Sequence, residues 1–107
     1  MPLPAYEKNL ETLAARLKKT GATVIWCSTT PVPEGCSPPR KDSDVLAYNA
    51  VAAKIAVRHG MPVNDLYTFA KPRLEKIQRP KNVHFTPQGS RVLAGQVASI
   101  IGEALKR

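Results

Sequence analysis

The chain has 107 residues, and its 16 Lys and Arg against 8 Asp and Glu give a formal net charge of +8. This length allows one domain, and 43% hydrophobic and 22% charged residues exclude a wholly disordered chain. No apolar run approaches the ~20 residues needed to span a bilayer, and the first residues do not resemble a signal peptide. No membrane partner is therefore expected, and the compartment stays open.

The positive charge does not by itself indicate a nucleic-acid partner. Cations at the predicted helix ends complement the helix macrodipole, and these are Lys18, Lys19, Arg58, Lys76, Arg79, Lys106 and Arg107. Aromatic residues make up only 6% of the chain, and no nucleic-acid-binding motif occurs. We therefore expect no nucleic-acid binding.

The first predicted element is a helix from about Pro4 to Thr20. Its apolar stripe steps by three and four residues and comprises Tyr6, Leu10, Leu13 and Leu17. Gly21 is expected to end it. The β-branched run from Ala22 to Ser28 then lacks alternation, which predicts a parallel strand covered on both faces.

The residues from Thr29 to Lys41 hold four prolines and a glycine, which exclude a helix or a central strand. A long loop at the end of a strand is often functional. Ligands bind at this edge of open parallel sheets, so the loop is expected to line a substrate cleft.

A second helix is predicted from Ser43 or Asp44, either of which can act as its N-cap, to Gly60. A short strand over residues 61–65 follows. Residues 66–77 again have helical periodicity, but Pro72 predicts a break near Lys71 and therefore two short turns.

The last helix is predicted to begin with Thr86 as cap and Pro87 as first residue. Strands that alternate with helices indicate an α/β fold with a parallel sheet. Two strands cannot bury the apolar faces of four helices, so residues 1–107 are interpreted as a single partial domain. Either the chain self-associates through its sheet edge, or further strands precede Met1 in the natural polypeptide.

The two cysteines, Cys27 and Cys36, are too few for a disulfide framework. Cys27 is expected to pack inside the first strand, although a bridge between the two across the long loop stays open. No metal site or other cofactor is predicted, because no cluster of Cys and His at ligand spacing occurs.

His84 is the strongest candidate for chemistry, because it lies in a loop just before a well-capped helix. The positive end of a helix disfavours the imidazolium form, so a histidine there tends to stay neutral and able to accept a proton. The alternative is a structural or merely solvated histidine. His59, beside Gly60 at a helix end, is interpreted in this second way, as structural or merely solvated.

The segment Val83-His84-Phe85-Thr86-Pro87-Gln88-Gly89 resembles the last block of the SGNH, or GDSL-type, serine hydrolases. The strand and Pro-containing loop over residues 22–33, Tyr48-Asn49 and residues 63–66 are also similar to that family. The likeness covers nearly the whole chain but only the family's C-terminal half. It implies a partial flavodoxin-like α/β/α sandwich with few parallel strands, and His84 as the general base.

Two departures limit what the resemblance implies. The family's nucleophilic serine and oxyanion-hole blocks have no counterpart, and the serines that match no such block are Ser28, Ser37, Ser43, Ser90 and Ser99. The family also places an Asp three residues before the His, where this chain has Lys81. Either a backbone carbonyl orients the ring, or another carboxylate does. Asp65 is the candidate triad acid, with capping of the following helix as the alternative.

Three functions stay open. The first is the C-terminal fragment of an esterase acting on acyl esters such as O-acetylated carbohydrates, inactive alone because nucleophile and oxyanion hole are absent. The second is a small non-catalytic α/β binding module that dimerises. The third is the C-terminal piece of a split hydrolase that pairs with a separate N-terminal half.

Overall fold

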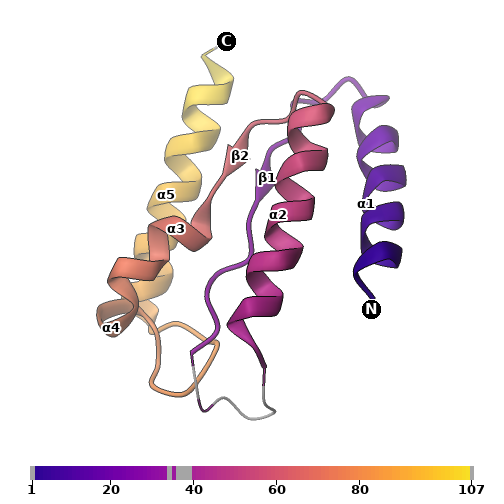
Figure 1. Ribbon diagram of the computed structural model, residues 1–107. Coiled ribbons are helices and arrows are strands. Elements are labelled where there is room, and N and C mark those ends of the chain that lie inside the picture. Colours follow the sequence, from indigo (N-terminus) through magenta and orange to yellow (C-terminus); the bar gives the residue numbers. More distant parts are fainter. Residues whose placement is uncertain (1, 34, 36–39, 107) are drawn as a thin grey trace.

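The computed structural model describes residues 2–33, 35 and 40–106 (Figure 1). Its elements are α1 (Leu3–Lys18), β1 (Trp26–Cys27), α2 (Asp42–Arg58), β2 (Val63–Asn64), α3 (Leu66–Ala70), the 3-10 turn η1 (Lys71–Arg73), α4 (Leu74–Ile77) and α5 (Pro87–Leu105). β1 and β2 pair in parallel. α1 and α2 lie on one face of this small sheet and α5 on the other, which confirms the predicted partial α/β/α sandwich.

The helix boundaries follow the sequence signals closely. Gly21 has a φ of +79° just beyond α1, a backbone conformation that glycine adopts at no steric cost. Thr86 caps α5 by accepting a hydrogen bond from the Gly89 N–H, and Pro87 is the first helical residue, as predicted. The break at Pro72 is also confirmed, because α3 ends at Ala70 and a 3-10 turn separates it from α4.

The start of α2 differs from the prediction. The helix begins at Asp42 with Lys41 as its N-cap and no side-chain capping bond, so the predicted cap at Ser43 or Asp44 is wrong. The Asp42 carboxylate faces other partners, because it accepts hydrogen bonds from the Val32 N–H and the Tyr67 hydroxyl. These contacts, with residues 10 and 25 positions away, hold the start of the helix at Asp42, which places Ser43 and Asp44 inside its first turn.

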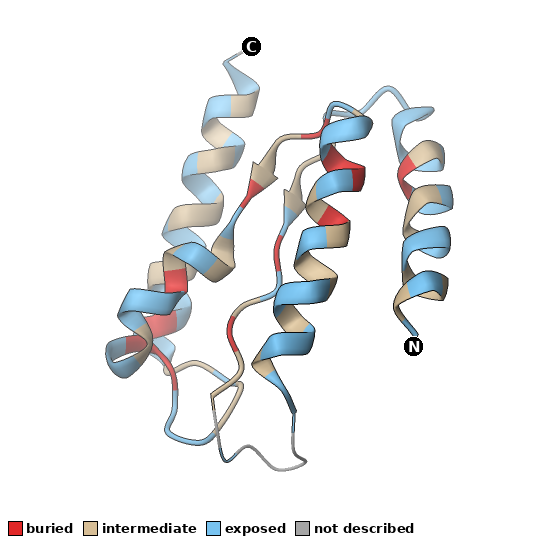
Figure 2. Ribbon diagram, viewed as in Figure 1, coloured by how far each residue is buried: buried red, intermediate tan, exposed pale blue. Residues whose placement is uncertain are grey.

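The main core lies between α1, α2 and the adjacent face of the sheet (Figure 2). Its buried side chains are Ala14, Ile55, Ala56 and Met61, with Leu10, Val24, Trp26, Val51 and Val63 packed against them. Val24, just before β1, and Trp26 at its start both pack against this core, two residues apart as in an extended chain.

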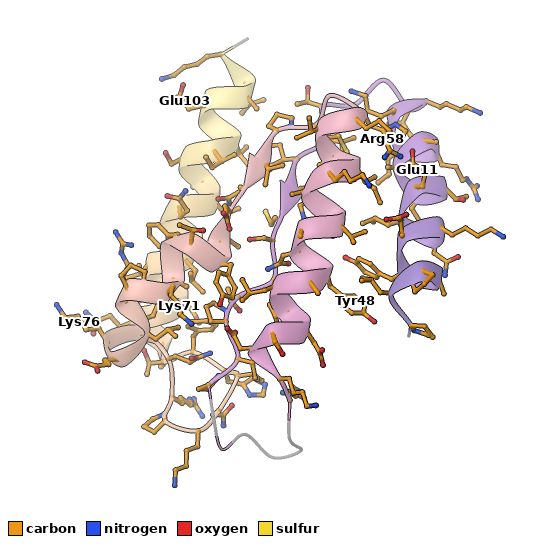
Figure 3. All side chains as sticks on the ribbon, viewed as in Figure 1. Glu11, Tyr48, Arg58, Lys71, Lys76 and Glu103 are labelled. Atoms are coloured by element: carbon orange, nitrogen blue, oxygen red, sulfur yellow. The ribbon has the colours of Figure 1, made fainter. Side chains whose placement is uncertain are left out.

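α1 and α2 are also joined by charges. Glu11 on α1 points toward Arg58 at the end of α2 (Figure 3), with Oε2 2.8 Å from the Arg58 Nη1 atom. The other oxygen of Glu11 lies 2.5 Å from His59 Nε2. The hydrogen bond from His59, ahead of the Arg58 charge, lowers the pKa of Glu11. This pairing supports a structural role for His59.

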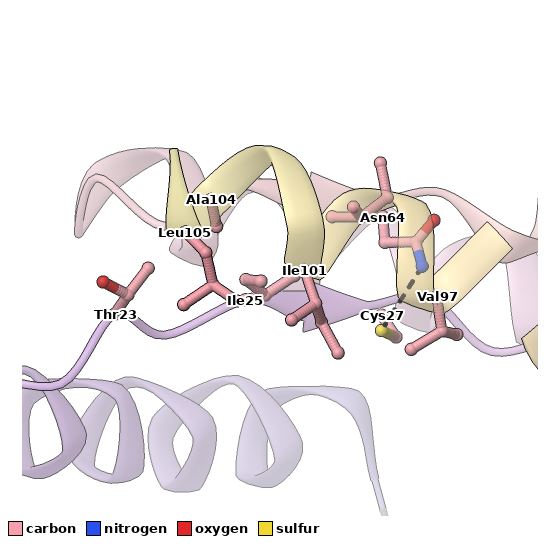
Figure 4. A pocket seen from close by; sticks show the side chains of 9 residues that line it. Thr23, Ile25, Cys27, Asn64, Val97, Ile101, Ala104 and Leu105 are labelled. Carbon is pink, nitrogen blue, oxygen red and sulfur yellow. Dashed lines mark hydrogen bonds between the residues drawn. The ribbon is translucent and has the colours of Figure 1, made fainter. Parts of the chain in front are cut away.

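The α5 side of β1 is open. Cys27 is an exposed free thiol, so the expectation that it packs inside the strand is wrong; Cys36 lies outside the described residues. Beside Cys27 is a largely apolar cavity of about 330 Å³ (Figure 4), lined by Thr23, Ile25, Cys27, Asn64, Val97, Ile100, Ile101, Ala104 and Leu105. In the described part of the chain β1 has a strand partner, β2, on one edge. The cavity leaves the α5 face of β1 partly uncovered, and within the described residues the other edge of β1 has no strand partner.

Three helices present large apolar side chains to solvent, and those of α2 are Leu46 and Val57. Leu13 and Leu17 of α1 are exposed although the predicted stripe included them, and Ile101 and Leu105 at the end of α5 are exposed too. Within the described residues, no helix combines the length and apolar character that crossing a membrane requires.

Candidate functional site

The site is built at the carboxyl ends of the two parallel strands. Ser28, directly after β1, is buried, and its hydroxyl donates to Asp65 Oδ1 at 3.0 Å and accepts from the Tyr67 N–H at 3.0 Å. Asp65, directly after β2, also accepts from the Thr68 hydroxyl at 2.7 Å and the Thr68 N–H at 3.2 Å. This network joins both strand ends to the start of α3.

Both oxygens of the Asp65 carboxylate accept hydrogen bonds from these donors. Burial raises the pKa of Asp65, but the hydrogen bonds from Thr68 and Ser28 outweigh it and lower the pKa overall. Asp65 is the N-cap of α3, which confirms the capping interpretation. In the part of the chain that the structure describes, no hydrogen bond joins Asp65 to His84.

The loop after β1 is held from two sides. The Asn49 amide on α2 accepts from the Thr29 N–H at 2.9 Å and donates to the Thr29 carbonyl at 2.8 Å. The Gln78 amide, from the segment after α4, donates to the Pro31 carbonyl at 3.2 Å and to the Val83 carbonyl at 3.4 Å. The side chain of Gln78 thus joins this loop to the loop that carries His84.

Asp42 is the second carboxylate near this loop. Its Oδ1 accepts from the Val32 N–H at 2.9 Å, Oδ2 accepts from the Tyr67 hydroxyl at 2.5 Å, and Lys71 Nζ is 3.5 Å from Oδ2. Burial raises the pKa of Asp42, but the Tyr67 and Val32 hydrogen bonds and the Lys71 charge lower it overall. Burial, then the bond to Asp42, raises the pKa of Tyr67. This contact fixes α3 against α2 and the loop.

The loop of His84 is a tight turn between α4 and α5. Gln78 and Phe85 form an antiparallel bridge, the Arg79 N–H donates to the His84 carbonyl at 3.0 Å, and the Thr86 N–H donates to the Ile77 carbonyl at 2.9 Å. At its tip, Lys81 has a φ of +52°. The backbone of His84 is therefore fixed although its side chain is exposed.

The His84 ring contacts Asn82, which the sequence interpretation did not single out. Asn82 Oδ1 lies 2.7 Å from His84 Nδ1 and accepts from the His84 N–H at 2.8 Å. An Asn two residues before a histidine is a recognisable signal, because Asn side chains commonly bond the backbone two residues on. Lys81, in the position of the family's Asp, lies toward the other loop: its Cγ is 3.2 Å from the site of a Cβ built on Gly35.

The Thr-Pro-x-Gly part of the motif seats α5 against α4. A Cβ added at Gly89 would lie 2.1 Å from the Ile77 carbonyl oxygen, so only glycine fits there. Because α5 starts on this contact, the motif determines where the loop of His84 ends. Among the described residues, no group of three or more His, Cys, Asp or Glu could hold a metal ion.

Comparisons with known proteins agree with this geometry. The model of the GDSL-like Lipase/Acylhydrolase family matches residues 1–92. The crystal structure of the lipase/acylhydrolase from Enterococcus faecalis superposes with a TM-score of 0.81 at 22% sequence identity. The match covers 94% of this chain and 52% of that one, so this chain spans about half the length of the matching structure. No curated protein sequence gave a significant match. The chain belongs to the GDSL-like lipase/acylhydrolase family.

Proposed function

We propose that this chain is the C-terminal, histidine-bearing half of a GDSL-type ester hydrolase, with His84 as its general base. The observation that carries the proposal is the held imidazole of His84: one ring nitrogen contacts Asn82 and the side chain is exposed next to the start of α5. Family membership supplies the chemical context.

In this mechanism a serine hydroxyl from the other half attacks the ester carbonyl carbon. His84 Nε2 takes the hydroxyl proton as the new carbon–oxygen bond forms, and then delivers it to the leaving alcohol as the acyl–oxygen bond breaks. Water repeats the cycle on the acyl-enzyme and releases the acid. Backbone or side-chain donors for the oxyanion also come from the other half.

The open side of the sheet supports a missing half. β1 has an unpaired edge in the described residues, and the apolar side chains exposed around it include Ile101 and Leu105. Exposed apolar surface of this kind marks an interaction site. The covering segment is either the N-terminal part of a longer polypeptide or a separate N-terminal chain. The chain alone is inactive, because the nucleophile and the oxyanion donors come from this covering segment.

The substrate class proposed is an acyl ester, such as an O-acetylated carbohydrate, and the reaction needs no metal or organic cofactor. The loop from Thr29 to Lys41 is expected at the strand ends, where ligands bind in open parallel sheets; its residues 34 and 36–39 lie outside the described residues, and residues 29–33 carry the proposal of a cleft here. Two side chains support this: Asn49 holds residue 29 against α2, and Gln78 joins residue 31 to the loop of His84.

The test is esterase activity of the chain joined to an N-terminal half, with a chromogenic acetate ester as substrate. His84→Ala should lower kcat by about 10⁶-fold, as loss of a triad base does. His59→Gln is the matched control, since that histidine contacts Glu11, and should keep kcat within about twofold. Near-wild-type activity in the His84 variant would refute the assignment. A stable, cooperatively melting dimer without activity would favour the non-catalytic binding module instead.

A further inference from the structure

Asn82 has a side-chain amide whose orientation is fixed by the backbone. Its nearer atom lies 2.8 Å from the His84 backbone nitrogen, which carries a hydrogen and can only donate. The atom that faces it must therefore be the amide oxygen and not the NH₂ group. The NH₂ group of Asn82 then points away from this contact.

The same oxygen determines the state of the His84 ring. It lies 2.7 Å from Nδ1, and an amide oxygen has only lone pairs to offer, so Nδ1 must carry the hydrogen. A neutral imidazole has one ring proton. Nε2 of His84 is therefore left with a free lone pair, the state that a general base requires.

We propose that Asn82 is the positioning residue of His84, holding the imidazole in the tautomer with Nδ1 protonated and Nε2 free. The inference rests on the proposed role of His84 as general base. Asn82 does the orienting work that an acid does in other triads, from a position two residues before the histidine. Lys81, three residues before it, has no part in this.

An Asn in place of a triad Asp is ordinarily damaging, because its amide can impose the wrong tautomer on the histidine. Here the second hydrogen bond, from the His84 N–H to the same oxygen, prevents that rotation. The amide is neutral, so it orients the ring without pairing its charge once the proton has been taken. Asn82 thus provides orientation and leaves stabilisation of the imidazolium to the rest of the site.

The second histidine of the chain, His59, is an internal control for the tautomer of His84. His59 contacts the Glu11 carboxylate through Nε2 at 2.5 Å. A carboxylate accepts only, so neutral His59 carries its proton on Nε2. The two histidines are therefore expected in opposite tautomers within one sample.

Long-range ¹H–¹⁵N NMR of the full chain at a pH of about 8.5, where histidine is ordinarily neutral, distinguishes these tautomers. The expected spectrum has His84 protonated at Nδ1 and His59 at Nε2. Asn82→Asp keeps an acceptor and should keep the His84 pattern, whereas Asn82→Leu should move His84 largely to the Nε2–H form and leave His59 unchanged. Wild-type His84 protonated at Nε2, or no change in Asn82→Leu, would overturn the proposal.

The spectrum and the activity separate the two proposals. With the N-terminal half present, Asn82→Leu should lower kcat by on the order of 10²-fold with little change in KM. Asn82→Asp, which keeps an acceptor for Nδ1, should keep the wild-type kcat. If Asn82 only stabilised the turn, the tautomer of His84 would be the same in Asn82→Leu as in the wild type. The expected tautomers in an enzyme that His84→Ala does not impair would refute the general-base role while the positioning by Asn82 stands.

Discussion

Asp65 makes the stability of the chain depend on acidity. Its folded-state pKa is lowered, since the hydrogen bonds from Thr68 and Ser28 outweigh the opposing effect of burial. A carboxyl group with a lowered folded-state pKa stabilises the fold above its unfolded pKa of about 3.9, and this contribution is lost as pH falls through the folded value. Asp65→Asn should therefore flatten the loss of stability below about pH 4, measured by urea unfolding at pH 7 and at pH 3.

Two further measurements on variants of Asp65 distinguish a helix cap from a triad acid. Asn is as good an N-cap as Asp, so Asp65→Asn should cost less stability at pH 7 than Asp65→Ala, which should cost about 1 kcal/mol. With the N-terminal half present, a capping residue leaves kcat nearly unchanged. A loss of about 10⁴-fold in the Asn variant would instead identify Asp65 as the triad acid.

Single residues in the loop of His84 were predictable to different degrees. The position of His84 before a helix, its Thr86 cap and the Pro87 start follow from local sequence, and the structure has them. Asn82 was missed because the family comparison directs attention to position 81, while the contact depends on the turn made by residues 78–85. The partners of Asp42 were equally out of reach, since they come from distant segments.

At the scale of elements, Gly89 and Gly95 of α5 provide a matched pair. A methyl group at Gly89 would strike the Ile77 carbonyl, whereas one at Gly95 has nothing within 4 Å. Gly89→Ala should destabilise by about 1–3 kcal/mol through overpacking, and Gly95→Ala should stabilise by about 0.5–1 kcal/mol through helix propensity. Thermal or urea unfolding of both variants measures this. Equal effects would contradict the seating of α5 on α4.

The elements themselves were largely predictable because their signals are local. Periodicity, Gly21 and the proline at 72 predicted the helices and the break between α3 and α4, and the structure confirms each. The strands are shorter than predicted, with residues 26–27 and 63–64 paired in place of two longer runs. Strand length depends on neighbouring strands, and β1 has only β2 beside it in the described residues.

At the scale of the whole molecule, the apolar faces of the helices are larger than the two-stranded sheet can cover. Leu13 and Leu17 on α1, and Ile101 and Leu105 on α5, are exposed although their helices have clear apolar stripes. The sequence predicted this shortage, since two strands cannot cover four helices. It could not predict where the uncovered surface lies, which includes the cavity beside β1 and the end of α5.

Cys27 reports directly on whether that surface becomes covered. Its thiol is exposed on β1 next to the apolar cavity under α5. In a chain with Cys36→Ser, so that one thiol remains, Cys27 should react with a disulfide reagent nearly as fast as in denaturant. Joining the N-terminal half should slow the reaction by on the order of tenfold or more. With a strand beside β1, the reagent would reach the Cys27 thiol only when this part of the fold opens locally. Equal rates with and without that half would contradict the proposal that strands of an N-terminal half lie against β1.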